Sequence, residues 1–502
     1  MKYTKIYITI LAIFSSIFAA DADLPITASV SIYCDHPATL VSPLLFGYNY
    51  SWVGISNILW DQQSGTVQIP GEINNVLAGL PLPLNRMSGT ASQYIHWKLA
   101  IGHIEERKEQ PLAKWMLKKP QKLTVGPIEW IKSILSIDSN ARFSWTLNLA
   151  LDTAEDHADL AEFFLGDGVS NPNGGINWAK KRIELGLARP VPVLLWELGN
   201  ELDWMEFKDQ FPIEVYVKKC KEAITAIRAV NPSAKFAAHA TTSAKSYTND
   251  SWKNWHQTIL KKIGSSIDYM VYHAYYHGIA TEVHERIMNS IHEDITNITG
   301  SDRIRFYISE HARWNNFKND KTQWYQTHSL AGCLSTAQWV SRMLQRGDVD
   351  LMTYHCFAGG PWGIVYRDEE KGQLYKTGIA DLFKLLSYEM TGFILKTEIT
   401  GAGTDGLSED LSLTAAAALE KNALNILVVN RDERMFRELS FKCNPPAGWT
   451  VIKETVLTAD DILSHNTVDN NAIRVTTAER DVVLDRYMVP AKCVMLLHAV
   501  KK

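Results

Sequence analysis

Short apolar runs alternate with longer amphipathic stretches between residues 44 and 393. Eight of these runs have the length and the branched or aromatic composition of strands; they lie at 45–50, 82–87, 142–150, 193–201, 234–240, 267–276, 303–311 and 350–357. The stretches between them repeat apolar residues at helical spacing, as Val217, Ile224 and Ile227 do within 213–230, with lysines on the opposite face. Eight strands that alternate with helices predict an α/β fold, a (β/α)8 TIM barrel.

An open, doubly wound sheet is the alternative arrangement for this pattern. It usually brings a glycine-rich turn that binds phosphate, and the Gly-Gly pairs at 174–175 and 359–360 are isolated. The barrel is therefore the favoured prediction.

The pattern changes near residue 394. Short strand-like runs separated by turn residues replace the helical stretches, at 422–431, 438–443, 449–457, 472–477 and 492–500. This pattern is typical of an all-β sandwich, which we predict for 394–502. The segment 23–43 contains the strand-like run 28–34, and we predict that it adds a strand to that sandwich.

The first residues have the pattern of a secretory signal peptide. Lys2 and Lys5 precede an apolar run over 6–20, and the small residues Ala20 and Ala22 suit a cleavage site. The apolar run has about 15 residues, fewer than the ~20 that a membrane span needs. We therefore predict a signal peptide over 1–22, a secreted or periplasmic protein, and no membrane span in the mature chain.

Charge and cysteine content narrow the function classes. The 502 residues carry a net charge of −4, which argues against a nucleic-acid partner. The six cysteines are dispersed and form no CxxC pair, so the sequence shows no zinc or redox motif. Export permits disulfides, and Cys443 and Cys493 are candidates to pair. The sequence predicts no cofactor and leaves open whether the chain forms a homo-oligomer.

Carboxylates follow two of the predicted strands, where barrel enzymes carry their active sites. The fourth strand ends in Asn200 and Glu201, the seventh contains Glu310, and the sixth ends with His273 and Tyr275. Two carboxyl groups that flank a glycosidic bond are the usual apparatus of glycoside hydrolysis. A carbohydrate is therefore the expected partner.

Roles for the neighbouring side chains follow from their chemistry. The Tyr275 hydroxyl can donate to Glu310 and keep that carboxylate ionised, while Asn200 can bind a sugar hydroxyl. Glu197 lies on the same strand face as Glu201 but deeper, and we interpret it as structural, paired with an arginine or a histidine. His273 and His277 have a spacing that metal pairs use on helices, but they lie at a strand end without a supporting acidic motif, so we predict no metal site.

The segment Trp-Glu-Leu-Gly-Asn-Glu at 196–201 resembles the W-E-[IL]-G-N-E motif of glycoside hydrolase family 51, the α-L-arabinofuranosidases. Segments 94–107, 177–186 and 464–475 are similar to further motifs of that family, in the same order. The resemblance implies that Glu201 is the acid/base and that Glu310 is the nucleophile of a retaining double displacement. It also implies substrate-binding roles for Asn200, His273, Tyr275, Arg86 and Trp115, and Trp314 is a further candidate for such a role.

The chain departs from the family pattern around the sugar. The nucleophile is flanked by Ser309 and His311 instead of the usual D-E-W, Ser51 stands where the family has a glutamate, and a strand-eight glutamine is replaced near His355. Both carboxylates of the family remain, so we still predict a secreted retaining α-L-arabinofuranosidase acting on plant-type polysaccharides. Two alternatives stay open: a related retaining glycosidase for another sugar, such as a heparanase-like β-glucuronidase, and a carbohydrate-binding pseudoenzyme. A metallohydrolase would need a His/Asp ligand cluster, which the strand ends lack.

Overall fold

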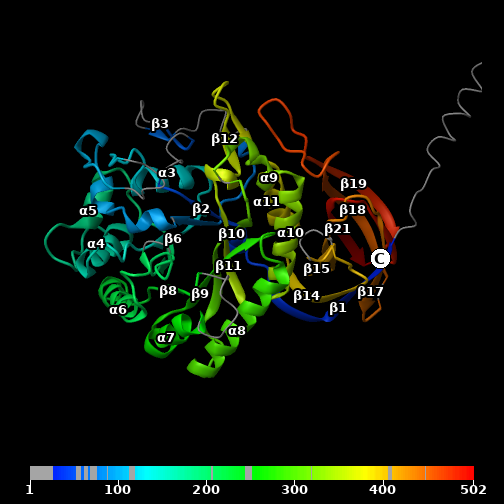
Figure 1. Ribbon diagram of the computed structural model, residues 1–502, viewed down its shortest axis with the longest axis horizontal. Coiled ribbons are helices and arrows are strands. Elements are labelled where there is room, and N and C mark those ends of the chain that lie inside the picture. Colours follow the sequence, from blue (N-terminus) through cyan, green and yellow to red (C-terminus); the bar gives the residue numbers. More distant parts are fainter. Residues whose placement is uncertain are drawn as a thin grey trace, which may run out of the picture.

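The computed structural model describes most of the chain as a barrel and a β-sandwich (Figure 1). The residues described are 26–52, 58–61, 66–67, 76–87, 89–111, 119–204, 207–242, 252–317, 319–404, 410–446 and 448–501. The predicted signal peptide and Trp115 lie outside these residues.

Eight parallel strands close the barrel in the order β10-β11-β2-β5-β6-β7-β8-β9, which confirms the predicted fold. Each of them overlaps one of the eight predicted runs. Their bounds are β2 Gly47–Tyr50, β5 Leu84–Met87, β6 Arg142–Thr146, β7 Val193–Glu197, β8 Phe236–His239, β9 Tyr269–Tyr276, β10 Arg305–Arg313 and β11 Val349–His355. Every strand is short and mostly buried, as barrel strands are when helices cover them.

Helices surround the barrel, and four of them match the stretches that the apolar spacing predicts. The helix α6 Ile213–Val230 has the predicted bounds because its pattern is regular and Pro232 follows it. The other helices are α3 Pro127–Ile137, α4 Ala154–Leu165, α5 Trp178–Glu184, α7 Lys253–Ile263, α8 Thr281–Thr299, α9 Tyr325–His328, α10 Leu330–Gln345 and α11 Gly378–Glu389. No helix in the described ranges is both long and apolar enough to cross a membrane.

The second unit is a nine-stranded sheet in the order β19-β18-β21-β16-β15-β14-β1-β17-β20. The strand β1 Ile26–Leu40 enters it antiparallel to β14 Phe393–Thr400 and parallel to β17 Arg437–Asn444. The remaining strands are β15 Leu413–Glu420, β16 Ala423–Asn430, β18 Trp449–Thr458, β19 Arg474–Val483, β20 Arg486–Val489 and β21 Cys493–Lys501. Short pairs β3 Trp60–Asp61 with β4 Thr66–Val67, and β12 Val365–Arg367 with β13 Leu374–Lys376, lie outside both sheets.

Alanines in β15 let the sandwich pack closely on the barrel. Ala416 and Ala418 belong to the barrel's apolar core, whereas Ala415 and Ala417 belong to the core of the sandwich. Side chains alternate across a strand, so β15 serves both cores, and small side chains allow α10 to approach it. The helices α10 and α11 accordingly lie between the two units in Figure 1.

The predicted pairing of Cys443 with Cys493 is not present in the structure. All six cysteines are free in the structure. Cys493 on β21 is buried and donates to the carbonyl oxygen of Pro490 at 3.2 Å, and Cys443 on β17 lies on a strand that is not its neighbour in the sheet. A hydrogen bond between the thiols of Cys34 and Cys443 instead lowers the pKa of Cys34.

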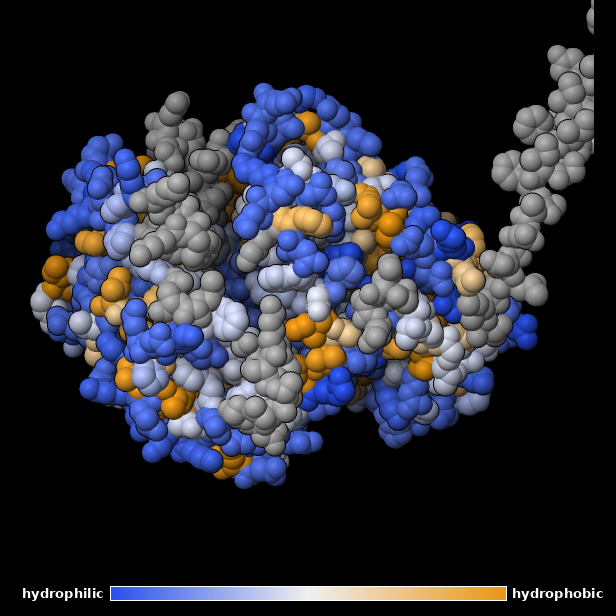
Figure 2. Space-filling model, in the orientation of Figure 1, coloured by the Kyte–Doolittle hydropathy of each residue, from blue (hydrophilic) through white to orange (hydrophobic). Residues whose placement is uncertain are grey.

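The surface is mostly polar on the face that Figure 2 shows, with apolar residues scattered in small groups. Such scattered residues are usual on soluble domains and need no partner.

Candidate active site

The polar side chains that the sequence singled out meet at the carboxyl ends of the barrel strands. Arg86 comes from β5, Glu197 from the end of β7, and Glu201 from the loop after it. His273 and Tyr275 come from β9, and β10 supplies Glu310. Parallel strands that close into a barrel bring their carboxyl ends to one face, so residues more than 200 positions apart become neighbours.

Glu310 is held by two donors of different chemistry. Its Oε1 accepts from Nη1 of Arg86 at 2.7 Å, and its Oε2 accepts from the hydroxyl of Tyr275 at 2.7 Å. Only 7% of the side chain is exposed. Burial by itself raises the pKa of Glu310, but the nearby cations, His273 foremost, and the Tyr275 hydroxyl hold it well below its usual range. The carboxylate is therefore ionised at neutral pH and fixed in direction.

Glu201 faces Glu310 across the barrel mouth. A carboxylate oxygen of Glu201 lies within 4.8 Å of one of Glu310. Its Oε1 is 2.7 Å from Nδ1 of His273, and 17% of its side chain is exposed. The backbone of Glu201 has φ +49°, in the left-handed region that a glutamate rarely adopts. Strain of this kind persists where the surrounding structure fixes a side chain in a required direction.

Behind the two facing carboxylates, Glu197 forms a completely buried ion pair with Arg86. Nε of Arg86 donates to Oε2 of Glu197 at 2.6 Å, and Nη2 donates to Oε1 at 2.9 Å. Neither side chain is exposed. Burial by itself raises the pKa of Glu197, but the charge of Arg86 and a hydrogen bond from His239 bring it to about 2. The structural role predicted for Glu197 fits this geometry, which pairs it with both an arginine and a histidine.

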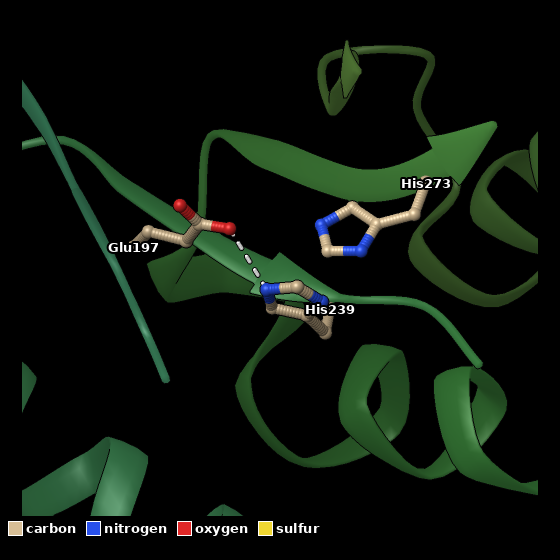
Figure 3. Close-up of side chains that lie close together, drawn as sticks. All are labelled: Glu197, His239 and His273. Atoms are coloured by element: carbon tan, nitrogen blue, oxygen red, sulfur yellow. Dashed lines mark hydrogen bonds and ion pairs between the residues drawn. The ribbon is translucent and has the colours of Figure 1, made fainter. Parts of the chain in front are cut away.

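Three more donors complete the surroundings of Glu197. Its Oε1 accepts from Nε2 of His239 at 2.8 Å and from Oγ of Ser309 at 2.9 Å, and its Oε2 accepts from Oγ1 of Thr146 at 3.0 Å. Figure 3 shows Glu197 joined to His239, with the ring of His273 beside them but not bonded to either. With the two bonds from Arg86, the carboxylate accepts from donors on both oxygens, which favours its charged form.

Two clusters of described residues that could in principle bind a metal ion already hold a protein cation. Glu197, His239 and His273 lie close enough to share an ion, but Arg86 neutralises Glu197. His96, Asp152 and Asp156 form a second cluster, where the ammonium of Lys98 is 2.7 Å from Asp156. A guanidinium or ammonium at these positions repels a metal cation, so we assign these clusters to ion pairing.

Two of the predicted substrate-binding residues turn out to be buried behind the carboxylates. Arg86 is fully buried and donates hydrogen bonds to Glu197, Glu310 and Asn200. Oδ1 of Asn200 accepts from Arg86 at 2.6 Å, and its Nδ2 donates to Oγ1 of Thr90 at 3.1 Å. The structure therefore places Arg86 as a support for Glu310, whereas the predicted sugar contact of Asn200 stays a prediction.

Aromatic rings form a wall on the Glu310 side. The ring of Tyr275 lies 5.9 Å from that of Trp314 and 5.6 Å from that of Trp362, in edge-on or tilted arrangements. His355, at the end of β11, lies 5.2 Å from Trp362 and holds Nδ2 of Asn49 at 2.9 Å with its Nδ1. Apolar ring surfaces of this kind suit the carbon face of a sugar, and the substrate-binding role of Trp314 stays a prediction.

The sequence did not predict the contacts that His239, Ser309, Asn49 and Trp362 make in the site. His239 ends β8 in the same way that His273 and Glu310 occupy strand ends, and this position was an available signal. Ser309 and Asn49 carry no such signal, because buried serines and asparagines occur throughout barrel strands.

Similarity to known proteins covers the part of the barrel that supplies most of these side chains. A family model, described as the alpha-L-arabinofuranosidase 1 domain, matches residues 85–286, from β5 into α8. An intracellular exo-α-(1→5)-L-arabinofuranosidase from Acetivibrio thermocellus is 24% identical over 208 residues, which are 41% of this chain and 38% of that protein. An exo-α-(1→6)-L-arabinofuranosidase from Bifidobacterium longum is 24% identical over 181 residues, 36% of this chain and 32% of that protein. The alignments thus span less than half of these curated relatives.

Solved structures share the whole fold. The family 51 α-L-arabinofuranosidase from Thermotoga petrophila superposes with a TM-score of 0.78 at 16% identity, over 94% of this chain and 100% of that one. The α-L-arabinofuranosidase from Thermotoga maritima, solved in complex with arabinose, gives 0.78 at 17% identity over 95% and 100%. The match of the family model over 85–286 and the shared fold agree with the resemblance that the sequence motifs indicated: the chain is similar to the family 51 α-L-arabinofuranosidases.

Proposed function

We propose that the chain is a glycoside hydrolase that removes α-L-arabinofuranosyl residues by a retaining double displacement. The observation that carries the proposal is the ionised Glu310, fixed by Arg86 and Tyr275, with Glu201 within 4.8 Å. Carboxyl groups about 5–5.5 Å apart are typical of retaining enzymes, whereas inverting enzymes leave about 6.5–9.5 Å for a water molecule. The close approach of one oxygen of Glu201 to one of Glu310 supports a retaining arrangement over an inverting one.

The two carboxyl groups divide the chemistry between them. Glu310 attacks the anomeric carbon and forms an ester, while Glu201 gives its proton to the leaving oxygen. Water then attacks the ester, and Glu201 takes a proton from it. Arg86 binds one carboxylate oxygen of Glu310 and Tyr275 binds the other, so the carboxylate needs little reorganisation before it reacts.

The sugar and the location are proposed on separate grounds. Arabinofuranose is proposed because the curated relatives carry that sugar in their names. Export is proposed from the amino-terminal sequence alone, and it distinguishes this chain from the relative named as intracellular. The natural substrate would then be an arabinose-containing polysaccharide or oligosaccharide outside the cytoplasm.

Release of 4-nitrophenol from 4-nitrophenyl α-L-arabinofuranoside tests the proposal. We expect turnover by the wild type and none by Glu310→Ala, whereas Glu398→Ala, which removes an exposed glutamate of the sandwich, keeps the wild-type rate. Proton NMR of the first-formed sugar should detect the retained anomer. An inverted anomer would contradict the double displacement, and turnover by Glu310→Ala would contradict the role of Glu310.

A second candidate sugar has one observation in its favour. His355 and Asn49 form a hydrogen-bonded pair at the wall beside Glu310, and the imidazole lies near the position where the family pattern has a glutamine. The same carboxylate pair could therefore act on another glycoside, such as a β-glucuronide. A panel of aryl glycosides separates the two, because turnover of another glycoside alone would keep the mechanism and change the substrate.

A further inference from the structure

Ser309 connects the buried Glu197 to the ring of His273. Its hydroxyl oxygen lies 2.9 Å from Oε1 of Glu197 and 2.9 Å from Nε2 of His273. On the other side of the ring, Nδ1 of His273 lies 2.7 Å from Oε1 of Glu201. A continuous chain of hydrogen bonds therefore runs from Glu197 to Glu201.

The protons in this chain can be assigned by counting donors. Glu197 is ionised and has no hydrogen to give, so the hydroxyl hydrogen of Ser309 points to it. The Ser309 oxygen can then only accept from the ring, so Nε2 of His273 carries a hydrogen. The remaining ring nitrogen, Nδ1, faces the carboxyl group of Glu201 with room for one proton between them.

We propose that Ser309 is a positioning residue that fixes the tautomer of His273, so that His273 and Glu201 share one proton. The inference rests on the proposed acid/base role of Glu201. Ser309 therefore acts on the acid/base through His273, without contacting a substrate itself.

The charges around His273 favour a proton on this pair. Burial by itself lowers the pKa of His273, but the charge of Glu310 and the hydrogen bond to Glu201 raise it above its usual value. Nδ1 of His273 is 3.8 Å from Oε2 of Glu310, and the ring centroid is 5.0 Å from that of His239. The titratable and charged groups that face His273 are Glu197 and Glu201 around β7, Arg86 on β5, His239 on β8, Glu310 on β10 and His355 on β11.

The consequence for pH dependence has a definite sign. In the wild type, Ser309 keeps the hydrogen of the neutral ring on Nε2. When the shared proton is lost, Nδ1 carries no hydrogen, and two acceptors, Nδ1 and the carboxylate of Glu201, face one another. In Ser309→Ala, the neutral ring can move its hydrogen to Nδ1 and still donate to Glu201. The pair then loses its proton more easily, so the alkaline limb of kcat/KM moves to lower pH.

The chain offers a matched control for this experiment. Thr146 also donates a hydroxyl to Glu197, at 3.0 Å, and no hydrogen bond joins it to His273 in the described structure. With an aryl α-L-arabinofuranoside, we expect the alkaline limb of Ser309→Ala to fall by about one pH unit, a roughly tenfold loss of kcat/KM above it. Thr146→Val should keep the wild-type limb. An unchanged limb in Ser309→Ala, or an equal shift in both variants, would overturn the proposal.

A second measurement does not depend on turnover. The nitrogen-15 shifts of labelled histidine, assigned to His273 by His273→Asn, report which ring nitrogen carries hydrogen. We expect Nε2–H in the neutral ring of the wild type and Nδ1–H in Ser309→Ala. Nδ1–H in the neutral wild type would overturn the proposal. Failure to hydrolyse any glycoside would count against the proposed function, while these shifts still test the tautomer.

Discussion

Arg86 and Glu310 form a buried ion pair, with Nη1 of the guanidinium 2.7 Å from Oε1 of the carboxylate. The same guanidinium also donates to Glu197 and, through Nη2, to Asn200, so its plane cannot turn without breaking four hydrogen bonds. A planar group with fixed donors is suited to this task, and a lysine could not make the same set of contacts. One side chain thus ties the orientation of Glu310 to the buried end of β7.

Replacing Arg86 by methionine should destabilise the fold. Glu197 would stay buried without its cation, and breaking a buried ion pair in this way costs about 3–5 kcal/mol in the free energy of unfolding. Urea denaturation at pH 7 measures this loss. Arg474→Met, which removes an exposed arginine paired with Asp460, should leave the unfolding midpoint close to that of the wild type. Equal midpoints for the two variants would contradict the structural role of Arg86.

Replacing Tyr275 by phenylalanine should change the acidic limb of activity. The hydroxyl stabilises the ionised form of Glu310, and its loss raises the pKa of that carboxyl group. Because the attacking group must be ionised, the acidic limb of kcat/KM should move up by about one pH unit.

Tyr272→Phe is the matched control for that experiment. Tyr272 lies on the same strand, and its hydroxyl bonds Nδ1 of His284 at 2.7 Å, away from Glu310. The control should lose some stability and keep the wild-type limb. If both variants shift the limb equally, the effect comes from the strand and not from the hydrogen bond to Glu310.

The fold was predictable wherever one apolar pattern decided the local structure. Helix α6 was predicted with its observed bounds, because a regular stripe of apolar residues ends before Pro232. Strand β15 was missed, because its run of alanines favours a helix in isolation. Burial between β14 and β16, with one core on each face, overrides that local preference.

The candidate site was predictable to the extent that its residues occupy strand ends. Glu201, Glu310, His273 and Tyr275 were placed by that rule and lie together in the structure. The partners of Glu197 could be named only by type, because the arginine lies 111 positions away on another strand. Ser309 was recognised only as a departure from the family pattern, and its role could not be predicted, since that role comes from the two atoms that it joins in space.

Stability at acid pH should depend on Glu197. Its pKa is about 2 in the folded protein against 4.5 for a free side chain. A depressed pKa contributes stability above the unfolded value and loses it as pH falls toward the folded value. The contribution is on the order of 3 kcal/mol at pH 7, lost between about pH 4.5 and 2. In urea denaturation, the advantage of wild type over Glu197→Gln should shrink across this range, and a constant difference would contradict the ionised state of Glu197.

Export should be visible in the mature amino terminus. If residues 1–22 are a signal peptide, the exported chain begins at Asp23. Mass spectrometry of the protein from the native host, after separation of cytoplasm from exported fractions, measures both location and terminus. A cytoplasmic protein that retains the apolar run over 6–20 would contradict the predicted export.

His355 should influence which sugar is accepted. Nδ2 of Asn49 donates to Nδ1 of His355, so the ring carries its hydrogen on Nε2 and offers a donor on that side. A glutamine offers both a donor and an acceptor, and one further hydrogen bond to a sugar hydroxyl is worth about a factor of ten in kcat/KM. We therefore expect His355→Gln to raise kcat/KM for an aryl α-L-arabinofuranoside, relative to other aryl glycosides, by about that factor. His36→Gln, an exposed histidine on β1, serves as the control. A fall in arabinofuranoside turnover in His355→Gln would instead mean that the imidazole itself recognises this sugar.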